Sequence, residues 1–254
     1  MLNFESLIKP HLEALPQQLT ESLKCQFHKD QVVRLNHLVP VEISNSLNAE
    51  AAKLIDNEGK RRELMMTVTG DTPRAYTSVD RDEIYALNGN IRKFFENGHI
   101  RNYLSIIADE PLNRVPYARE EYIVNSQKQI GDTHGWHFDD YSYALIWVAE
   151  APDPLDGGRI EYVNFSEWDK AAPKEQLIEL LTKRETRSMF VPEGSCYLMK
   201  ARYVLHRVAP LISGKKRRTV IVFTYASDAD MNDRTISHET MEAIYEVDPE
   251  TSVV

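Results

Sequence analysis

Residues 131–140 (GDTHGWHFDD) carry the densest set of side chains able to do chemistry. In an extended chain, side chains two positions apart point to the same side, so His137 and Asp139 share one side and Phe138 faces the other. An imidazole and a carboxylate placed in this way can bind one metal ion. A third ligand is needed, and His206, in a later segment rich in strand-forming residues, can supply it.

A cation at the head of a predicted buried strand adds a second part to this site. Arg218 follows His206 by twelve residues and begins the run RTVIVFTY. A buried arginine without a carboxylate partner is destabilising, and its position is explained if the carboxylate of a bound 2-oxo acid pairs with it. Arg217 is a competing anchor, but Arg218 is preferred because the alternate residues of the strand, up to Thr224, would share its inward face.

At these residues the chain resembles the Fe(II)/2-oxoglutarate-dependent dioxygenases. Their pattern is His-x-Asp, a distal His and a following Arg on a double-stranded β-helix, and two histidines with one carboxylate leave three metal positions open. The resemblance covers residues 117–227 and includes residues 156–161 (DGGRIE) as the hairpin after the first two ligands. It implies that the His-Asp-His set binds Fe(II), that 2-oxoglutarate and O₂ are cosubstrates, and that Arg218 binds 2-oxoglutarate.

Four further residues match the substrate-contacting positions of a closer group, the free-lysine halogenases and the related lysine 4-hydroxylases. They are Arg74, Glu120, His134 and Asp140. The similarity implies that Arg74 and His134 bind the carboxylate of a free amino acid. Glu120 and Asp140 would then bind its ammonium groups, as charge complementarity requires. Thr224 either adds a hydroxyl to this site or faces a neighbouring strand.

The residue at the carboxylate-ligand position separates two reactions within this group. In the related halogenases a small residue such as Gly takes this position and leaves a site for chloride. Asp139 fills that site here, so we expect hydroxylation, with L-lysine at C4 as the favoured substrate and 4-hydroxylysine, succinate and CO₂ as products. The alternatives are hydroxylation of another free basic amino acid or of protein side chains, and a β-barrel whose metal is structural.

Some of these residues also have simpler interpretations. Arg74 and Glu120 belong to types that usually lie on the surface. His134 and His137 have the spacing of a zinc pair, although no matching Cys or Glu set accompanies them. We interpret the basic residues 215–217 as a solvated turn. The remaining histidines, including His238, are expected to be structural or exposed.

Composition restricts the class of protein. The chain has 254 residues, with thirty Lys and Arg against thirty-nine Asp and Glu, and the net charge of −9 argues against a nucleic-acid partner. Two cysteines fit a reducing cytoplasm. The first ten residues lack a signal-peptide pattern, and no apolar run approaches the ~20 residues of a membrane span. We therefore expect a cytoplasmic protein with a small-molecule substrate and no membrane partner, either monomeric or homo-oligomeric.

The first part of the chain, residues 1–110, has mainly helical patterns. Apolar residues recur at helical spacing in residues 2–27, with expected breaks at Pro10 and Pro16. Further helices are expected from Ser44 or Ser46 and from Asp80 to residues 97–98.

The second part contains short runs rich in Tyr, Val, Ile and Thr, which predict strands. These runs are residues 117–124, 143–149, 159–163, 187–191, 195–199 and 219–225, with one helix inserted at 173–183. We predict one α+β domain over residues 1–254. N-terminal helices would buttress a core at residues 117–227, which the resemblance implies is a double-stranded β-helix of the jelly-roll or cupin-like kind.

Overall fold

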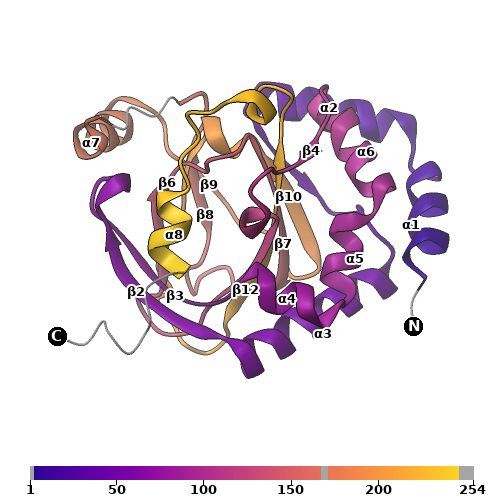
Figure 1. Ribbon diagram of the computed structural model, residues 1–254, viewed down its shortest axis with the longest axis horizontal. Helices are drawn as coiled ribbons and strands as arrows, with labels where there is room; N and C mark the ends of the chain where they lie inside the picture. Colours follow the sequence, from indigo (N-terminus) through magenta and orange to yellow (C-terminus); the bar gives the residue numbers. More distant parts are fainter. Residues whose placement is uncertain (1–2, 167–170, 246–254) are drawn as a thin grey trace.

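The protein is a curled antiparallel sheet with helices packed on its outer face (Figure 1). The computed structural model describes residues 3–166 and 171–245. Its strands are β1 (Val32–Leu35), β2 (Lys60–Met66), β3 (Thr72–Val79), β4 (Asn113–Arg114), β5 (Tyr122–Gln127), β6 (Thr133–His137), β7 (Tyr143–Glu150), β8 (Ile160–Val163), β9 (Arg187–Met189), β10 (Ser195–Met199), β11 (Leu205–Val208) and β12 (Arg218–Ala226). Its α-helices are α1 (Phe4–Glu13), α2 (Gln17–Asp30), α3 (Val41–Glu58), α4 (Arg81–Leu87), α5 (Asn90–Glu96), α6 (Gly98–Ala108), α7 (Pro173–Lys183) and α8 (Glu239–Tyr245). Short 3-10 helices are η1 (Thr67–Thr69), η2 (Ala118–Glu120), η3 (Ala201–Tyr203) and η4 (Asp230–Asn232).

All twelve strands belong to one sheet in the order β1-β10-β7-β12-β5-β3-β6-β11-β8-β9, with β2 added to β3 and β4 added to β12. Helices α1 to α6 gather on one side of this sheet, and α7 and α8 lie on the other (Figure 1). The predicted α+β class, with N-terminal helices buttressing a curled antiparallel core, is confirmed.

Alternation along the central strands separates an outer core from the inside of the curl. In β7, Leu145 and Trp147 pack into the outer core with the helices, whereas Ile146 and Val148 pack into a second cluster on the other face. Strand β12 alternates in the same way. Because side chains alternate between the two faces of a strand, every second residue of these strands faces the inside of the curl.

The helical layer is held by apolar faces at helical spacing. Helix α3 buries Ile43, Leu47, Ala51 and Leu54 in the outer core, and α5 buries Ile91, Phe94 and Phe95 there. The first turn of α5 is capped from α3, because both carboxylate oxygens of Glu50 accept the N–H groups of Asn90 and Ile91. This layer therefore fixes the outer face of the strands that carry the site.

Two expectations for the first half of the chain were wrong. Pro10 lies inside α1 and does not break it, because Asn3 caps the helix and the burial of Phe4 and Ile8 outweighs one lost hydrogen bond. The helix expected from Asp80 is two helices, because residues 88–89 (Asn-Gly) form a turn with Asn88 in the left-handed region. Strands β1, β2 and β3, which were not predicted, also lie within residues 1–110.

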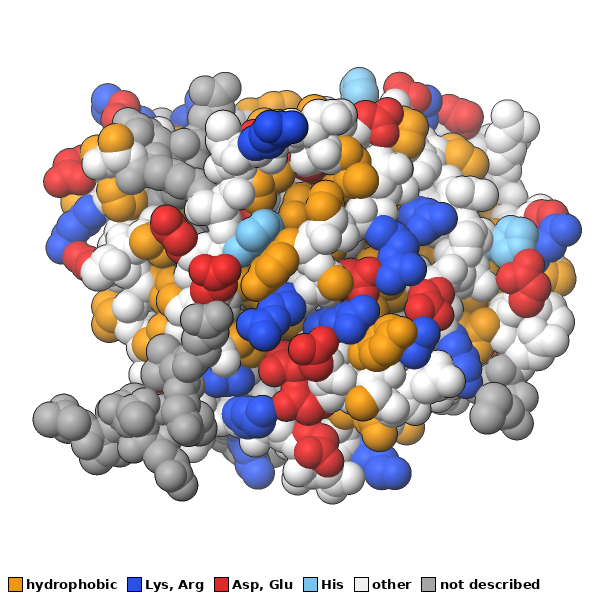
Figure 2. All heavy atoms as spheres, in the orientation of Figure 1, with side chains coloured by type: hydrophobic (Ala, Val, Ile, Leu, Met, Phe, Trp, Pro, Cys, Tyr) orange, Lys and Arg blue, Asp and Glu red, His pale blue; other side chains and the backbone are white. Residues whose placement is uncertain are grey.

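The predicted helix at 173–183 and the strands β7, β8 and β10 are confirmed within a residue at each end. On the face that Figure 2 shows, the Lys and Arg side chains of the described residues lie next to Asp and Glu side chains and form no single continuous basic area. Within residues 3–166 and 171–245, none of the helices has the length and apolar character needed to cross a membrane.

Candidate active site

Two histidines and one aspartate meet on the inner face of the sheet. His137 ends β6 and pairs in register with His206 on β11. The Oδ1 atom of Asp139 lies 3.5 Å from Nε2 of His137 and 3.6 Å from Nε2 of His206. The N–H of Asp139 donates to the carbonyl of Ala201 at 3.2 Å, which holds the segment after β6 against η3. These three side chains form a group that could hold a metal ion.

Backbone carbonyls fix the orientation of both imidazoles. Nδ1 of His137 lies 2.7 Å from the carbonyl oxygen of Gly135, and Nδ1 of His206 lies 2.9 Å from that of Val204. When each Nδ1–H donates to its carbonyl, Nε2 is the nitrogen with a lone pair, and both Nε2 atoms are turned toward Asp139. The donor set therefore has the tautomers and the direction that a metal requires.

Burial disfavours charge on this group in the absence of a cation. It lowers the pKa of His137 well below its usual value, and nearby His206, His134 and Arg74 lower it further. Burial raises the pKa of the Asp139 carboxyl, although His206 and Arg74 oppose that shift. A divalent ion bound here would favour the neutral imidazoles and the ionised carboxylate.

A cavity extends from this group along the inner faces of β5 and β12. Its β12 wall consists of Arg218, Val220, Val222 and Thr224, and its β5 wall consists of Ile123, Asn125 and Gln127. Arg218 and Thr224 are six positions apart on an extended strand, which corresponds to about 20 Å. The cavity is therefore long enough to bring two small molecules to one metal.

The two adjacent arginines at the start of β12 face opposite ways. Arg217 points outward and pairs with Glu150 and Asp56. Arg218 is buried and lines the cavity, where its Nη1 lies 3.4 Å from Oε1 of Gln127, and it forms no ion pair with any carboxylate of the described residues. Burial lowers the pKa of Arg218, and the nearby Tyr197 opposes that shift. This end of the cavity is electrostatically suited to a carboxylate.

Two amides beside Arg218 were missed in the sequence. Oδ1 of Asn125 and Nε2 of Gln127 are buried in the cavity wall, and neither atom has a hydrogen-bond partner within the described chain. Buried polar atoms without partners are rare in folded proteins, so these atoms indicate a place where a polar ligand binds. The expected strand ended at residue 124, whereas β5 continues to Gln127. Extending the alternation by three residues would have revealed both amides.

Arg74 and His134 lie next to each other, as partners in register between β3 and β6. His134 lines the cavity, and its ring stacks on His137 with centroids 4.1 Å apart. Arg74 is fully buried, and its Nη atoms donate to Thr72, Pro73 and Thr69. Its Nε has no partner in the described structure, and Arg74 is not among the residues that line the cavity. His134 is thus placed for ligand contact more directly than Arg74.

Two carboxylates lie at the far end of the cavity, away from Arg218. Glu120 and Asp140 both line it, and Thr224 lies beside them because its N–H donates to the carbonyl of Glu121 at 3.0 Å. His238, expected to be structural or exposed, joins this pair with its Nδ1 2.7 Å from Oε1 of Glu120. Nothing in the sequence signals this contact across 118 positions.

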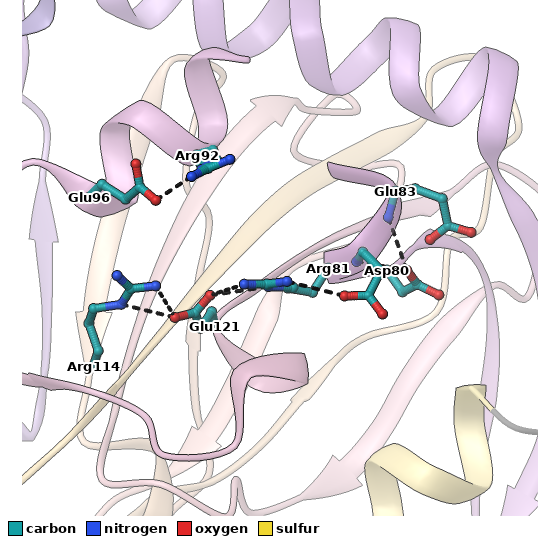
Figure 3. A network of polar contacts seen from close by, with 8 residues as sticks. Asp80, Arg81, Glu83, Arg92, Glu96, Arg114 and Glu121 are labelled. Carbon is teal, nitrogen blue, oxygen red and sulfur yellow. Dashed lines mark hydrogen bonds and ion pairs between the residues drawn. The ribbon is translucent and has the colours of Figure 1, made fainter. Parts of the chain in front are cut away.

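The neighbour of Glu120 anchors this end of the site. Glu121 is buried, and its two oxygens accept hydrogen bonds from Arg81 and Arg114 (Figure 3). Nε and Nη2 of Arg81 lie 3.2 and 3.1 Å from Oε2 of Glu121. Because Glu120 and Glu121 are consecutive, this ion-pair network fixes the turn from which Glu120 faces the cavity.

Helix α8 covers the cavity from the side of β2. Thr240, Met241, Ile244 and Tyr245 line it. The guanidinium of Arg62 on β2 lies 4.9 Å from the ring centroid of Tyr245. Figure 1 shows α8, in yellow, lying across the part of the sheet that contains β2, β3 and β6. The cavity is thus bounded by the sheet and by a late segment of the chain.

Comparison with protein families identifies the type of enzyme. The profile of the family described as Halogenase D matches residues 15–246. The chain belongs to the halogenase D family. This is a family of non-haem iron, 2-oxoglutarate-dependent halogenases and oxygenases, so the protein is an enzyme of that type. No curated protein matches the sequence significantly.

Solved structures share the fold of this halogenase D family member. The α-ketoglutarate-dependent epimerase SnoN from nogalamycin biosynthesis is 15% identical, with 84% of each chain covered and a TM-score of 0.61. AviO1 from Streptomyces viridochromogenes Tue57 is 20% identical, with 83% of this chain and 96% of that chain covered and a TM-score of 0.58. A Pseudomonas putida prolyl-4-hydroxylase is 13% identical, with 82% and 98% covered and a TM-score of 0.51. At these identities the likeness concerns the fold.

Proposed function

We propose that this protein is an Fe(II)- and 2-oxoglutarate-dependent hydroxylase of a free basic amino acid, with L-lysine at C4 as the favoured substrate. One observation carries the proposal. A single cavity places the His137, Asp139 and His206 group between Arg218, which has no carboxylate partner in the described chain, and the Glu120 and Asp140 pair.

The residues present fit both iron and 2-oxoglutarate. Two oriented Nε2 atoms and one carboxylate are the donor set of non-haem Fe(II) oxygenases. Arg218 would bind the distal carboxylate of 2-oxoglutarate, with Gln127 and Tyr197 beside it. SnoN, which shares this fold with a TM-score of 0.60 at 13% identity, has been solved with Fe³⁺, α-ketoglutarate and nogalamycin RO. Bound iron, with 2-oxoglutarate and O₂, supplies the oxidant that converts a substrate C–H to C–OH while 2-oxoglutarate yields succinate and CO₂.

The charges at the remaining end of the cavity favour a cationic substrate. Glu120 and Asp140 would bind an ammonium group, and His134, with Arg74 behind it, would bind the carboxylate. Burying two carboxylates against a neutral side chain is unfavourable, so neutral amino acids should be rejected. Holding both ends of lysine leaves a middle methylene as the part nearest the metal.

Asp139 favours hydroxylation over halogenation. Its carboxylate lies beside His137 and His206, where it would take the ligand position that the related halogenases leave open, and its negative charge would oppose a halide there. Membership of the halogenase D family makes chlorination the second candidate. Both reactions would use the same cavity, so the product distinguishes them.

The test is a screen of free amino acids in high chloride. The purified protein, loaded with Fe(II), is given 2-oxoglutarate, O₂ and each proteinogenic amino acid or ornithine, and succinate and product mass are measured. We expect lysine to gain one oxygen atom and no chlorine, and a lysine inside a peptide, which lacks the free carboxylate, to stay unmodified.

Three results would contradict the proposal in different ways. A chlorinated lysine would show that Asp139 does not fill the ligand position as argued. Reaction of a neutral amino acid alone would overturn the assignment of Glu120 and Asp140. Without O₂, absence of the charge-transfer absorption of Fe(II) with 2-oxoglutarate would favour a structural metal.

A further inference from the structure

The segment that leads into α8 contacts the carboxylate end of the cavity through His238. Nδ1 of His238 lies 2.7 Å from Oε1 of Glu120, so the ring N–H donates to the carboxylate. The imidazole stacks on Tyr117, with centroids 4.0 Å apart and planes 19° apart, and lies at a tilt 6.0 Å from Tyr141. The hydroxyl of Tyr141 in turn accepts the N–H of Tyr117 at 3.3 Å. The position of the imidazole is therefore determined by two rings as well as by Glu120.

His238 touches Glu120 from outside the cavity. Glu120 and Asp140 are lining residues and His238 is not, although one ligand atom from each of the three lies within 4.8 Å of the others. Glu120 is thus held from two directions. Behind it, Glu121 is fixed by Arg81 and Arg114, and beside it, His238 fixes the carboxylate oxygen.

The same segment supplies the cover of the cavity. His238 immediately precedes α8, and Thr240, Met241 and Ile244 follow it within six residues as lining residues. Ile244 is buried. The carbonyl of His238 accepts the N–H of Glu242 at 2.9 Å, so the position of His238 beside Glu120 is tied to the first turn of α8.

We propose that His238 is a positioning residue that holds Glu120 for the ammonium group of the substrate and couples that contact to the seating of α8 over the cavity. This inference rests on the proposed function and names a contact, between His238 and Glu120, that would favour cationic amino acids as substrates. An ammonium ion binds best to a carboxylate whose rotamer is already fixed, since less conformational entropy is lost on binding. A neutral side chain forms no ion pair with Glu120, so fixing this carboxylate does not strengthen its binding.

The test compares three variants of the full chain loaded with Fe(II). His238→Phe keeps a ring against Tyr117 and removes the N–H, and His238→Asn restores a donor without the ring. The matched control is His99→Phe, which removes another imidazole–carboxylate pair, Nε2 of His99 with Oε1 of Glu5 at 2.6 Å, away from the cavity. KM and kcat for L-lysine, KM for 2-oxoglutarate and 2-oxoglutarate consumed per product are measured. Hydrogen exchange of α8 is measured with and without L-lysine.

We expect His238→Phe to raise KM for L-lysine about tenfold or more, because a hydrogen bond to a charged group is lost, while KM for 2-oxoglutarate is unchanged. More 2-oxoglutarate should be consumed per product. L-lysine should slow exchange in α8 of the wild type and of His99→Phe, but not of His238→Phe. His238→Asn should recover part of the affinity, and it carries the test if the Phe variant does not fold.

Two outcomes would overturn different claims. If wild-type protein hydroxylates L-lysine and His238→Phe has the same KM and the same protection of α8, the role of His238 is wrong while the proposed function stands. If the wild type neither binds nor converts L-lysine or any other basic amino acid, the proposed function fails and the role of His238 fails with it.

Discussion

At the scale of single residues, Arg217 and Arg218 differ in environment more than in chemistry. Arg217 lies on the outer face against Glu150 and Asp56, and two anionic partners raise its pKa. Arg218 lies in the cavity with Gln127 and Tyr197. Consecutive residues of a strand point to opposite faces of the sheet, so these two adjacent arginines have different surroundings.

We predict that Arg218→Ala weakens binding of 2-oxoglutarate by about 2 to 5 kcal/mol, which is roughly a thirtyfold or larger rise in Kd or KM. The physical reason is the loss of a buried charge pair with the distal carboxylate. The measurement is KM in the succinate assay and Kd from anaerobic titration. Arg217→Ala is the matched control and should leave both constants unchanged. The opposite ranking would move the anchor to the neighbouring residue.

At the scale of elements, the turn η2 and the start of β5 depend on a buried ion-pair network. Glu121 accepts from Arg81 at the start of α4 and from Arg114 on β4, so one carboxylate joins three elements (Figure 3). Removing one partner of a buried pair leaves the other charges without compensation. The backbone of Glu120, the residue before Glu121, would then no longer be held in place.

We predict that Glu121→Gln lowers the free energy of unfolding by about 2 to 4 kcal/mol, less than for a fully buried pair because the Arg114 side chain is 45% exposed. KM for the amino-acid substrate should rise as well, since η2 positions Glu120. Urea unfolding and steady-state kinetics measure the two effects.

The control for this prediction is Glu96→Gln. It removes the exposed partner of Arg92 in the same region and should change neither stability nor KM (Figure 3). Equal effects of the two substitutions would show that the ion pairs of Glu121 stabilise the protein no more than an exposed ion pair does.

At the scale of the whole molecule, the candidate metal-binding group brings together parts of the sheet that are distant in sequence. His137 and Asp139 come from the end of β6, and His206 comes from β11, which pairs with both β6 and β8. A metal ion bound only by the folded chain stabilises it by mass action. Stability should therefore report metal binding even where no reaction is measured.

We predict that Mn(II), used as a stable probe at about 100 times its Kd, stabilises the protein by about 2.7 kcal/mol and raises Tm by about 5 to 10 °C. Differential scanning calorimetry measures the shift. His206→Ala should abolish it, whereas His99→Ala, at a half-buried histidine outside this group, should retain it. A shift that persists in His206→Ala would place the metal elsewhere.

Short-range patterns predicted much of the fold. Helix α7 was predicted at residues 173–183 and is found there, and the expected strand at 143–149 is β7. Such elements follow from local periodicity and turn residues, which act over a few positions. The break between α4 and α5 was equally local, in the Asn88-Gly89 turn, but the stronger apolar period on both sides concealed it.

The sequence by itself predicted His137, Asp139 and His206 as a candidate metal-binding group, because the residue types and the His-x-Asp spacing can be identified without knowledge of the fold. Only the tertiary structure decided how the residues around this group are arranged. Strand β3 brings Arg74 beside His134, and α8 brings His238 to Glu120 across 118 positions. Contacts of this kind depend on how the sheet curls and where α8 packs. Both are determined by the burial of apolar surface over the whole chain and not by a local sequence pattern.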